Sequence, residues 1–243
     1  MKRLVLLLIV VMMFTLNLMA QGKRDYVDLG LSSGTLWATC NLGAKSPEQF
    51  GDYYGWGEIK PHFYKGKWSK PLQEGYYGYC WPNYRLCNRS FKLLTKYCCH
   101  EEYGNKGFTD YRVLLNPEDD AASVVMGRQW HIPTEEQWQE LIDEAVWTWT
   151  ENYHNTSVSG YIVANRHNKD VHIFLPAAGF YDKNRFFQGG FTGDYWSSSL
   201  DSDDSSYAWF VSFHHDDCNV VRNNRYYGIS IRAVRSLGDE VSR

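Results

Sequence analysis

The stretch that begins at Thr134 limits the possible folds more than any other part of the sequence. Thr134 and Gln137 have the spacing of a capping box, in which each side chain bonds the backbone N–H of the other residue at the start of a helix. The apolar residues that follow recur at the spacing of one helix face: Trp138, Leu141, Ile142 and Ala145. After Gly160 the sequence reads as antiparallel β-structure, with strand-like segments separated by polar turns. The sequence therefore predicts mixed α and β structure.

A shorter helix is predicted upstream of this one. It begins at residues 116–117, where Pro117 suits a first helical turn, and it stops at Gly127. Three acids fall in its first turn, where the helix dipole stabilises negative charge: Glu118, Asp119 and Asp120. We interpret these acids as capping groups and not as metal ligands.

Short strands account for much of the remaining sequence. Residues 26–44 predict a strand, a turn at 32–34 and a second strand, whereas residues 45–110 show no sustained period and predict a long irregular excursion. Later strands are expected at 161–164, 171–175, 195–199, 208–213 and 229–234. Long polar connections follow three of the predicted strand regions, at 181–193, 201–207 and 214–227. Rigid strands that carry long loops are typical of a recognition surface.

The N-terminus predicts export. Lys2 and Arg3 precede an apolar run over residues 4–14, and Ala20 offers a small residue for cleavage, which together indicate a signal peptide at 1–20. No cysteine near Ala20 offers a lipid attachment site, and no later run is apolar enough to span a bilayer. We expect residues 21–243 to form a single domain that is periplasmic, secreted or on the cell surface, without membrane insertion after signal cleavage.

Charge and cysteine content narrow the possible partners. The formal net charge is −3 and Lys and Arg form no block, so nucleic acid is not an expected partner.

An oxidising compartment would permit disulfides, and six cysteines allow fifteen pairings, so the connectivity stays open. Cys80 and Cys87 could close a local loop, whereas the neighbours Cys98 and Cys99 suit each other poorly. No C-x-x-C pair occurs, and neither a zinc site nor a cofactor is predicted.

Other patterns that could carry chemistry lack what the chemistry needs. Residues 30–34 match G-x-S-x-G, but a nucleophile elbow requires a helix after the serine and a strand follows here. Residues 214–217 hold two His and two Asp, of which an extended segment would bring at most two together as metal ligands. A calcium loop starting at Asp201 fails, because Ser206 and Ser212 replace the required Gly and Glu.

A series of short motifs gives the chain a family resemblance. In order they are YVDLGL at 26–31, GTLWATCN at 34–41, YGWGE at 54–58, LTKYC at 94–98, PEDDAA at 117–122, IPT at 132–134, FLPAAG at 174–179, YWSSS at 195–199 and SIRAV at 230–234. Together they resemble the Fibrobacter succinogenes major paralogous domain family, common in Bacteroidetes, over nearly all of residues 21–243. The resemblance implies the α+β class and a C-type-lectin-like fold: two helices packed on small antiparallel sheets, with long irregular loops, similar to formylglycine-generating-enzyme-like domains.

The same resemblance bears on activity. Formylglycine-generating enzymes use two nearby late cysteines to handle copper and oxygen, but Cys218 is the only cysteine in that part of this sequence. The sugar-binding motifs of animal C-type lectins are also absent, so calcium-dependent sugar binding is not expected. Some proteins of this fold are diversified by retroelements that mutate Asn codons, and residues 201–207 and 214–227 are rich in residues reachable that way. The resemblance therefore suits a binding protein with genetically diversified loops, and the missing second late cysteine argues against catalysis.

We therefore predict an exported, non-catalytic ligand-binding module, for adhesion or recognition, that binds a protein or glycan through its C-terminal loops. A formylglycine-generating-type oxidase-like enzyme and a purely structural cell-envelope protein are the alternatives. If the lectin-like fold holds, the three late connections gather on one side and form the binding surface. Tyr and Arg side chains dominate binding hot spots. The predicted binding residues are Arg185, Phe186, Phe187, Phe191, Tyr207, His214, His215, Asp217, Arg222, Asn224, Tyr226 and Tyr227.

Overall fold

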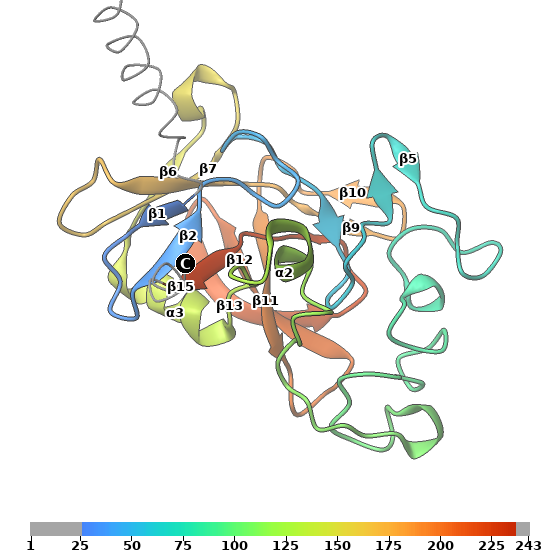
Figure 1. Ribbon diagram of the computed structural model, residues 1–243. Helices are drawn as coiled ribbons and strands as arrows, with labels where there is room; N and C mark the ends of the chain where they lie inside the picture. Colours follow the sequence, from blue (N-terminus) through green and yellow to red (C-terminus); the bar gives the residue numbers. More distant parts are fainter. Residues whose placement is uncertain (1–25, 237–243) are drawn as a thin grey trace, which may run out of the picture.

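The computed structural model describes residues 26–236, and a five-stranded sheet runs through its centre (Figure 1). The strand order is β13 (Asp217–Asn224), β12 (Tyr207–His214), β11 (Gly193–Leu200), β14 (Ile229–Ser230) and β3 (Tyr53–Tyr54). All neighbours are antiparallel except β11 and β14, which pair in parallel. The predicted signal peptide at 1–20 lies outside the described residues.

Each face of this central sheet buries its own hydrophobic core, because successive strand residues point to opposite faces. Tyr195 and Val211 belong to one core, which is completed by α3 (Glu135–Glu144) and the sheet of β6 (Val146–Thr150), β7 (Gly160–Ala164) and β8 (His172–Pro176). Trp196 and Phe210 belong to the other core, which α2 (Ala121–Met126) and parts of residues 42–97 complete. The strands predicted at 195–199 and 208–213 therefore contribute to two cores, one on each face of the sheet.

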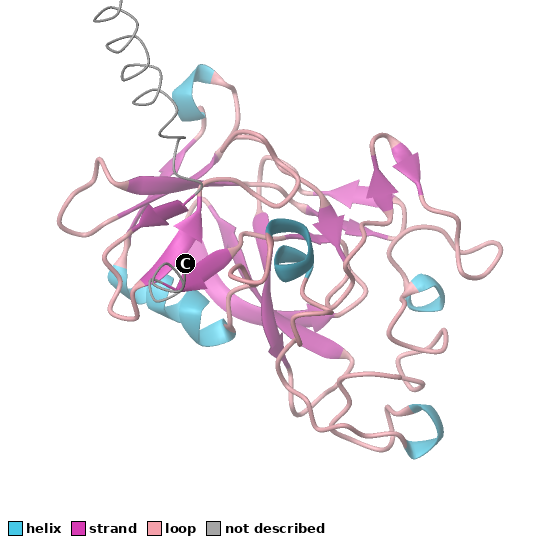
Figure 2. Ribbon diagram, viewed as in Figure 1, coloured by secondary structure: helices cyan, strands magenta, loops and turns pink. Residues whose placement is uncertain are grey.

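Smaller sheets surround the centre (Figure 2). One contains β1 (Tyr26–Asp28), β2 (Thr35–Ala38) and β15 (Val234–Ser236), and another contains β6 (Val146–Thr150), β7 (Gly160–Ala164) and β8 (His172–Pro176). Two hairpins are formed by β4 (Phe63–Tyr64) with β5 (Lys67–Trp68), and by β9 (Phe180–Asp182) with β10 (Arg185–Phe187). Short 3₁₀ turns lie at Trp81–Asn83, Asn105–Gly107 and Tyr153–Asn155.

The predicted α+β class, with a C-type-lectin-like fold of two helices packed on small sheets, is wrong. Over residues 26–236 the fold is mostly β, with 34% strand and 12% helix, and the two α-helices of this part have six and ten residues. The main reason is that segments expected to be loops pair as strands. Residues 214–227 include β13, which pairs with β12 over eight residues, and residues 181–193 include all of the β9–β10 hairpin except Phe180. Strand β6 was also not predicted.

Helix α3 confirms the prediction made from its capping box. The Gln137 backbone N–H donates to Thr134 Oγ1 at 3.2 Å, and the Thr134 N–H donates to Gln137 Oε1 at 3.0 Å. Trp138 is fully buried and its indole N–H donates to the Trp196 carbonyl at 3.1 Å, which fastens the helix to β11. Helix α2 starts later than predicted. Its cap is Asp120, which accepts from the Ser123 N–H at 2.9 Å.

Replacement of Thr134 by alanine should lower the free energy of unfolding by about 1 kcal/mol, because it removes the hydroxyl that accepts from the third helical N–H. Urea unfolding measures this difference. Thr134→Ser is the control, since it keeps the hydroxyl and should lose much less stability. Equal losses for the two variants would contradict a capping role for the hydroxyl.

The irregular excursion predicted over residues 45–110 is present, and in Figure 1 it runs from blue through cyan to green. Buried side chains hold its start together. Glu58 Oε2 lies 2.7 Å from His62 Nε2, and His62 Nδ1 lies 2.8 Å from Asn83 Nδ2.

All six cysteines are free, so the loop closure considered for Cys80 and Cys87 is not formed. Among residues 26–236 no helix is long and apolar enough to cross a membrane.

Candidate functional site

None of the predicted binding residues is buried, but the structure divides them. His214, His215 and Asp217 lie at the turn between β12 and β13, whereas Tyr207 and Asn224 pair at the opposite end of the same hairpin. At roughly 3.3 Å per residue, the two ends are separated by more than 20 Å. The expectation that 201–207 and all of 214–227 gather on one side is therefore wrong, because a fully paired hairpin keeps its two connections apart.

An aromatic cluster joins the β9–β10 hairpin to the end of β13. The rings of Phe180 and Phe187 stack with centroids 5.5 Å apart, and Phe180 lies 5.5 Å from Tyr227, which in turn lies 4.7 Å from Tyr226. We call these four residues the aromatic ridge. The Arg185 guanidinium lies 5.5 Å from the Phe187 ring. Four of the predicted residues, Arg185, Phe187, Tyr226 and Tyr227, are thus brought together.

The other predicted residues lie outside this cluster. Phe186 packs toward Tyr53, with ring centroids 5.9 Å apart, and Phe191 is 75% exposed. Arg222 forms an ion pair with Asp201, and its position opposite Trp209 places it on the other face of the sheet from Phe210. The ridge is therefore the part of the predicted surface that forms a continuous site.

A cavity of about 180 Å³ opens beside the ridge, on the face of the central sheet that carries Phe210. Rings and an aliphatic side chain form part of its wall, and amide, hydroxyl and carboxyl groups form the rest. Its lining residues are Phe180, Gln188, Asp194, Phe210, Ser212, Asn223, Tyr227 and Ile229. Apolar walls with a few convergent polar groups are typical of ligand sites. Tyr227 is the one lining residue that the sequence predicted.

Asp194 is the chemically distinctive group of the cavity. It is 5% exposed, and the Thr192 hydroxyl donates to its Oδ2 at 3.2 Å, with a second hydrogen bond from Ser212. Burial raises the pKa of the Asp194 carboxyl, and the two hydroxyl groups oppose this shift only in part. The sequence signal was an acid in a run that becomes a fully buried strand, where Asp is rare. It was missed because the predicted strand began at residue 195.

A second group of polar side chains lies at the β12–β13 turn. One ligand atom each from His214, His215 and Asp216 falls within 4.8 Å of the others, whereas at most two were expected to converge. The expectation assumed an extended segment, but the chain turns at residues 215–216. All three side chains are exposed, and His215 Nε2 already lies 2.6 Å from Asp216 Oδ2. The cavity is the better candidate, because its polar groups are shielded from competing water.

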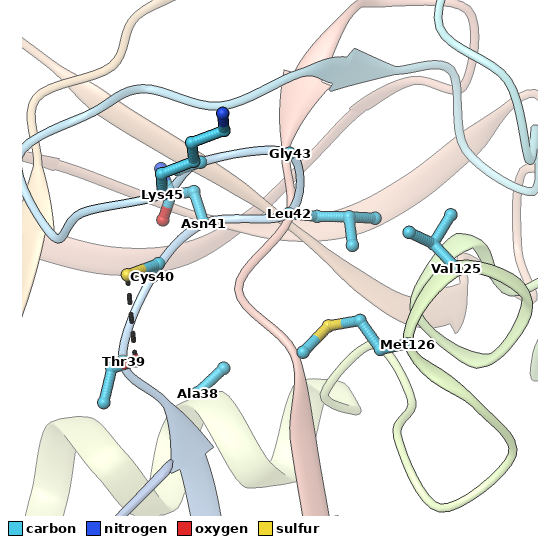
Figure 3. A pocket seen from close by; sticks show the side chains of 10 residues that line it. Ala38, Thr39, Cys40, Asn41, Leu42, Gly43, Lys45, Val125 and Met126 are labelled. Atoms are coloured by element: carbon cyan, nitrogen blue, oxygen red, sulfur yellow. Dashed lines mark hydrogen bonds between the residues drawn. The ribbon is translucent and has the colours of Figure 1, made fainter. Parts of the chain in front are cut away.

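A larger cavity of about 270 Å³ lies between residues 38–45 and the end of α2. Figure 3 shows Leu42 and Val125 pointing toward each other there, with Met126 beside them. The Cys40 thiol contacts Thr39 Oγ1 at 3.7 Å. The chemistry of this lining is weaker, because Asn41 is its one buried polar side chain and that group already bonds the Phe50 carbonyl.

Comparison with known proteins places the cavity within a matched segment. A family model described as a domain of unknown function (DUF8237) matches residues 159–234, less than half of the chain. Every residue that lines the cavity beside the ridge lies within this segment. No curated protein and no solved structure matches the chain.

Proposed function

We propose that this chain is an exported, non-catalytic recognition module that binds a protein or glycan partner through the aromatic ridge and the adjoining cavity. The observation that carries the proposal is the cavity itself: Phe180, Phe210 and Tyr227 provide apolar wall, and Asp194, Ser212 and Asn223 provide polar contacts. Tyr and Phe supply contact area at low entropy cost, while amide and hydroxyl groups adapt their hydrogen bonds to a ligand.

The lack of catalytic pairing in the cavity supports a binding role. Among its lining residues there is no His, Cys or Lys, so Ser212 has no neighbouring imidazole or amine in the lining to act as a general base. Asp194 accepts a hydrogen bond from the Ser212 hydroxyl, but its raised pKa reflects burial and not a second acid beside it. Convergent polar groups without a nucleophile and base pair suit recognition better than reaction.

Export is supported by the sequence alone. Lys2 and Arg3 before the apolar residues 4–14 have the order of a signal peptide. We therefore place the protein in the periplasm, outside the cell or on the cell surface as part of this proposal.

Screening of the purified protein on a glycan array and on an array of immobilised peptides tests the proposal. For any probe that is bound, Tyr227→Ala should weaken binding at least about tenfold, because central aromatic side chains carry a large share of binding energy. Surface plasmon resonance on the selected probe gives the dissociation constants.

Tyr111→Ala is the matched control, because Tyr111 is 69% exposed and lies outside the matched segment and the ridge. It should bind as the unmodified protein does. Wild-type affinity in Tyr227→Ala, equal losses in both variants, or no bound probe on either array would count against the proposal.

A further inference from the structure

Four carboxyl side chains are buried within residues 26–236, and three of them have strong partners. Glu58 lies against His62 and Arg85, Asp201 pairs with Arg222, and Asp120 accepts the backbone N–H groups of Ser123 and Ile132. The fourth is Asp194, which has only the hydroxyl groups of Thr192 and Ser212. A carboxylate offers about four acceptor sites, so these two donors leave capacity for more.

No cation of the described chain neutralises Asp194. Its carboxyl takes part in none of the ion pairs formed within residues 26–236. Arg222 lies on the other face of the sheet, where it forms an ion pair with Asp201. The Arg185 guanidinium lies over the Phe187 ring. A buried carboxylate is costly unless it is paired. No residue within 26–236 supplies that partner, and a cation that enters the cavity from outside would stabilise the ionised form of Asp194.

The walls around Asp194 suit a positively charged organic group. Phe180, Phe210 and Tyr227 line the same cavity, and the faces of such rings attract ammonium groups. Ile229 adds apolar wall. We infer that the cavity binds the side-chain ammonium of a lysine on a protein partner, with Asp194 as its counter-ion. This inference rests on the proposed recognition function and specifies the ligand group.

Size and composition favour a lysine side chain over an amino sugar. A cavity of about 180 Å³ is smaller than typical pockets for whole small molecules, which begin near 300 Å³, so it admits one terminal group. The methylene stem of lysine can lie along rings and Ile229, as such stems do on apolar surfaces. A sugar ring would bring several hydroxyl groups into a space whose wall is partly apolar.

Removal of the Asp194 charge should weaken ligand binding but should not lower the thermal stability of the protein. Since burial raises the pKa of this carboxyl above its unfolded value, its ionised form is disfavoured in the folded state. Its contribution to stability is therefore greatest at acid pH and is lost as the pH rises through the folded pKa. Asp194→Asn, which keeps the shape and an acceptor for Thr192, should melt at the same or a higher temperature at neutral pH.

Isothermal titration of the purified protein with N-acetyl-lysine-methylamide tests the inference, with N-acetyl-norleucine-methylamide as the uncharged analogue. The lysine probe should bind at least about tenfold more tightly than norleucine, and Asp194→Asn should remove at least about a tenfold preference. The matched control, Asp170→Asn, changes an exposed acid in the β7–β8 turn and should keep the preference. Thermal melting establishes that each variant is folded.

Equal affinity for the two probes, or an unchanged preference in a folded Asp194→Asn variant, would overturn the inference. Glucosamine is a further probe: Asp194-dependent binding of glucosamine without binding of the lysine probe would reassign the site to amino sugars and also overturn it. If the lysine probe fails while an array ligand still depends on Tyr227, only the lysine assignment falls and the recognition function stands. If neither holds, both fall.

Discussion

Arg232→Met is expected to lower the free energy of unfolding by about 3–5 kcal/mol, since it strips several buried acceptors of their donors at about 1–3 kcal/mol each. The Arg232 side chain is fully buried. Its Nε and Nη2 donate to Asn41 Oδ1 at 3.0 and 2.7 Å, and Nη2 also donates to the Phe174 carbonyl at 2.8 Å. Nη1 donates to the Ala38 carbonyl at 3.1 Å. One side chain thus ties the end of β2 to β8.

Denaturant unfolding, followed by tryptophan fluorescence, measures the loss. Arg232→Lys should be almost as unstable as Arg232→Met, because an ammonium group cannot reproduce the planar fork of donors that reaches Asn41 and Phe174 together. Arg112→Met is the control, since Arg112 is exposed and its loss should cost less than about 0.5 kcal/mol. A similar free energy of unfolding for the Arg232 and Arg112 variants would contradict the structural role.

Arg232 also explains why the predicted strand at 229–234 is divided. Residues 229–230 pair in the central sheet and residues 234–236 pair with β2, while the three residues between them form no strand. The backbone leaves one sheet and enters another at the point where Arg232 turns inward. Alternation of apolar residues cannot reveal this change, because Ile231 and Ala233 are buried on either side of it.

Local signals predicted local structure well. Helix α3 was predicted because its cap, its apolar face and its polar face all lie within about ten residues. The β1–β2 hairpin was predicted for the same reason, from two strands around a short turn. Such elements need no knowledge of the rest of the chain, so sequence reasoning finds them.

Elements that depend on distant partners were not predicted. Strand β13 is rich in Asp and Asn, which have low strand propensity, and it forms because β12 provides a complete ladder and the core below accepts Cys218 and Val220. The mostly β character of the fold was missed for this reason, and because the β9–β10 hairpin was not predicted. The cavity could not be predicted either, because Phe180, Asp194 and Tyr227 meet only once these strands are paired.

The burial of Arg225 likewise depends on distant segments and could not be predicted from the sequence. In the sequence it lies within the 214–227 connection, which was expected to form part of an exposed binding surface, yet its side chain is fully buried. Its Nη1 donates at 2.9 Å to the carbonyls of Tyr97 and Ser205, and its guanidinium lies 4.8 Å from the Trp56 ring. An arginine can be buried here because carbonyls and a ring face, supplied by distant segments, surround it.

Arg225→Met should therefore loosen the excursion selectively. The change removes the donors to Tyr97 and Ser205 and to the Lys96 carbonyl, and we expect a loss of about 2–4 kcal/mol that falls mainly on residues 84–97. Hydrogen exchange with mass spectrometry should show faster exchange in peptides from that segment than in peptides from α3, whose cap and buried Trp138 are untouched. Because Tyr226 packs on Trp81 at 5.3 Å, the aromatic ridge should loosen with the excursion and probe binding should weaken too. Equal acceleration of exchange in the excursion and in α3 would mean that Arg225 stabilises the whole fold instead of this one attachment.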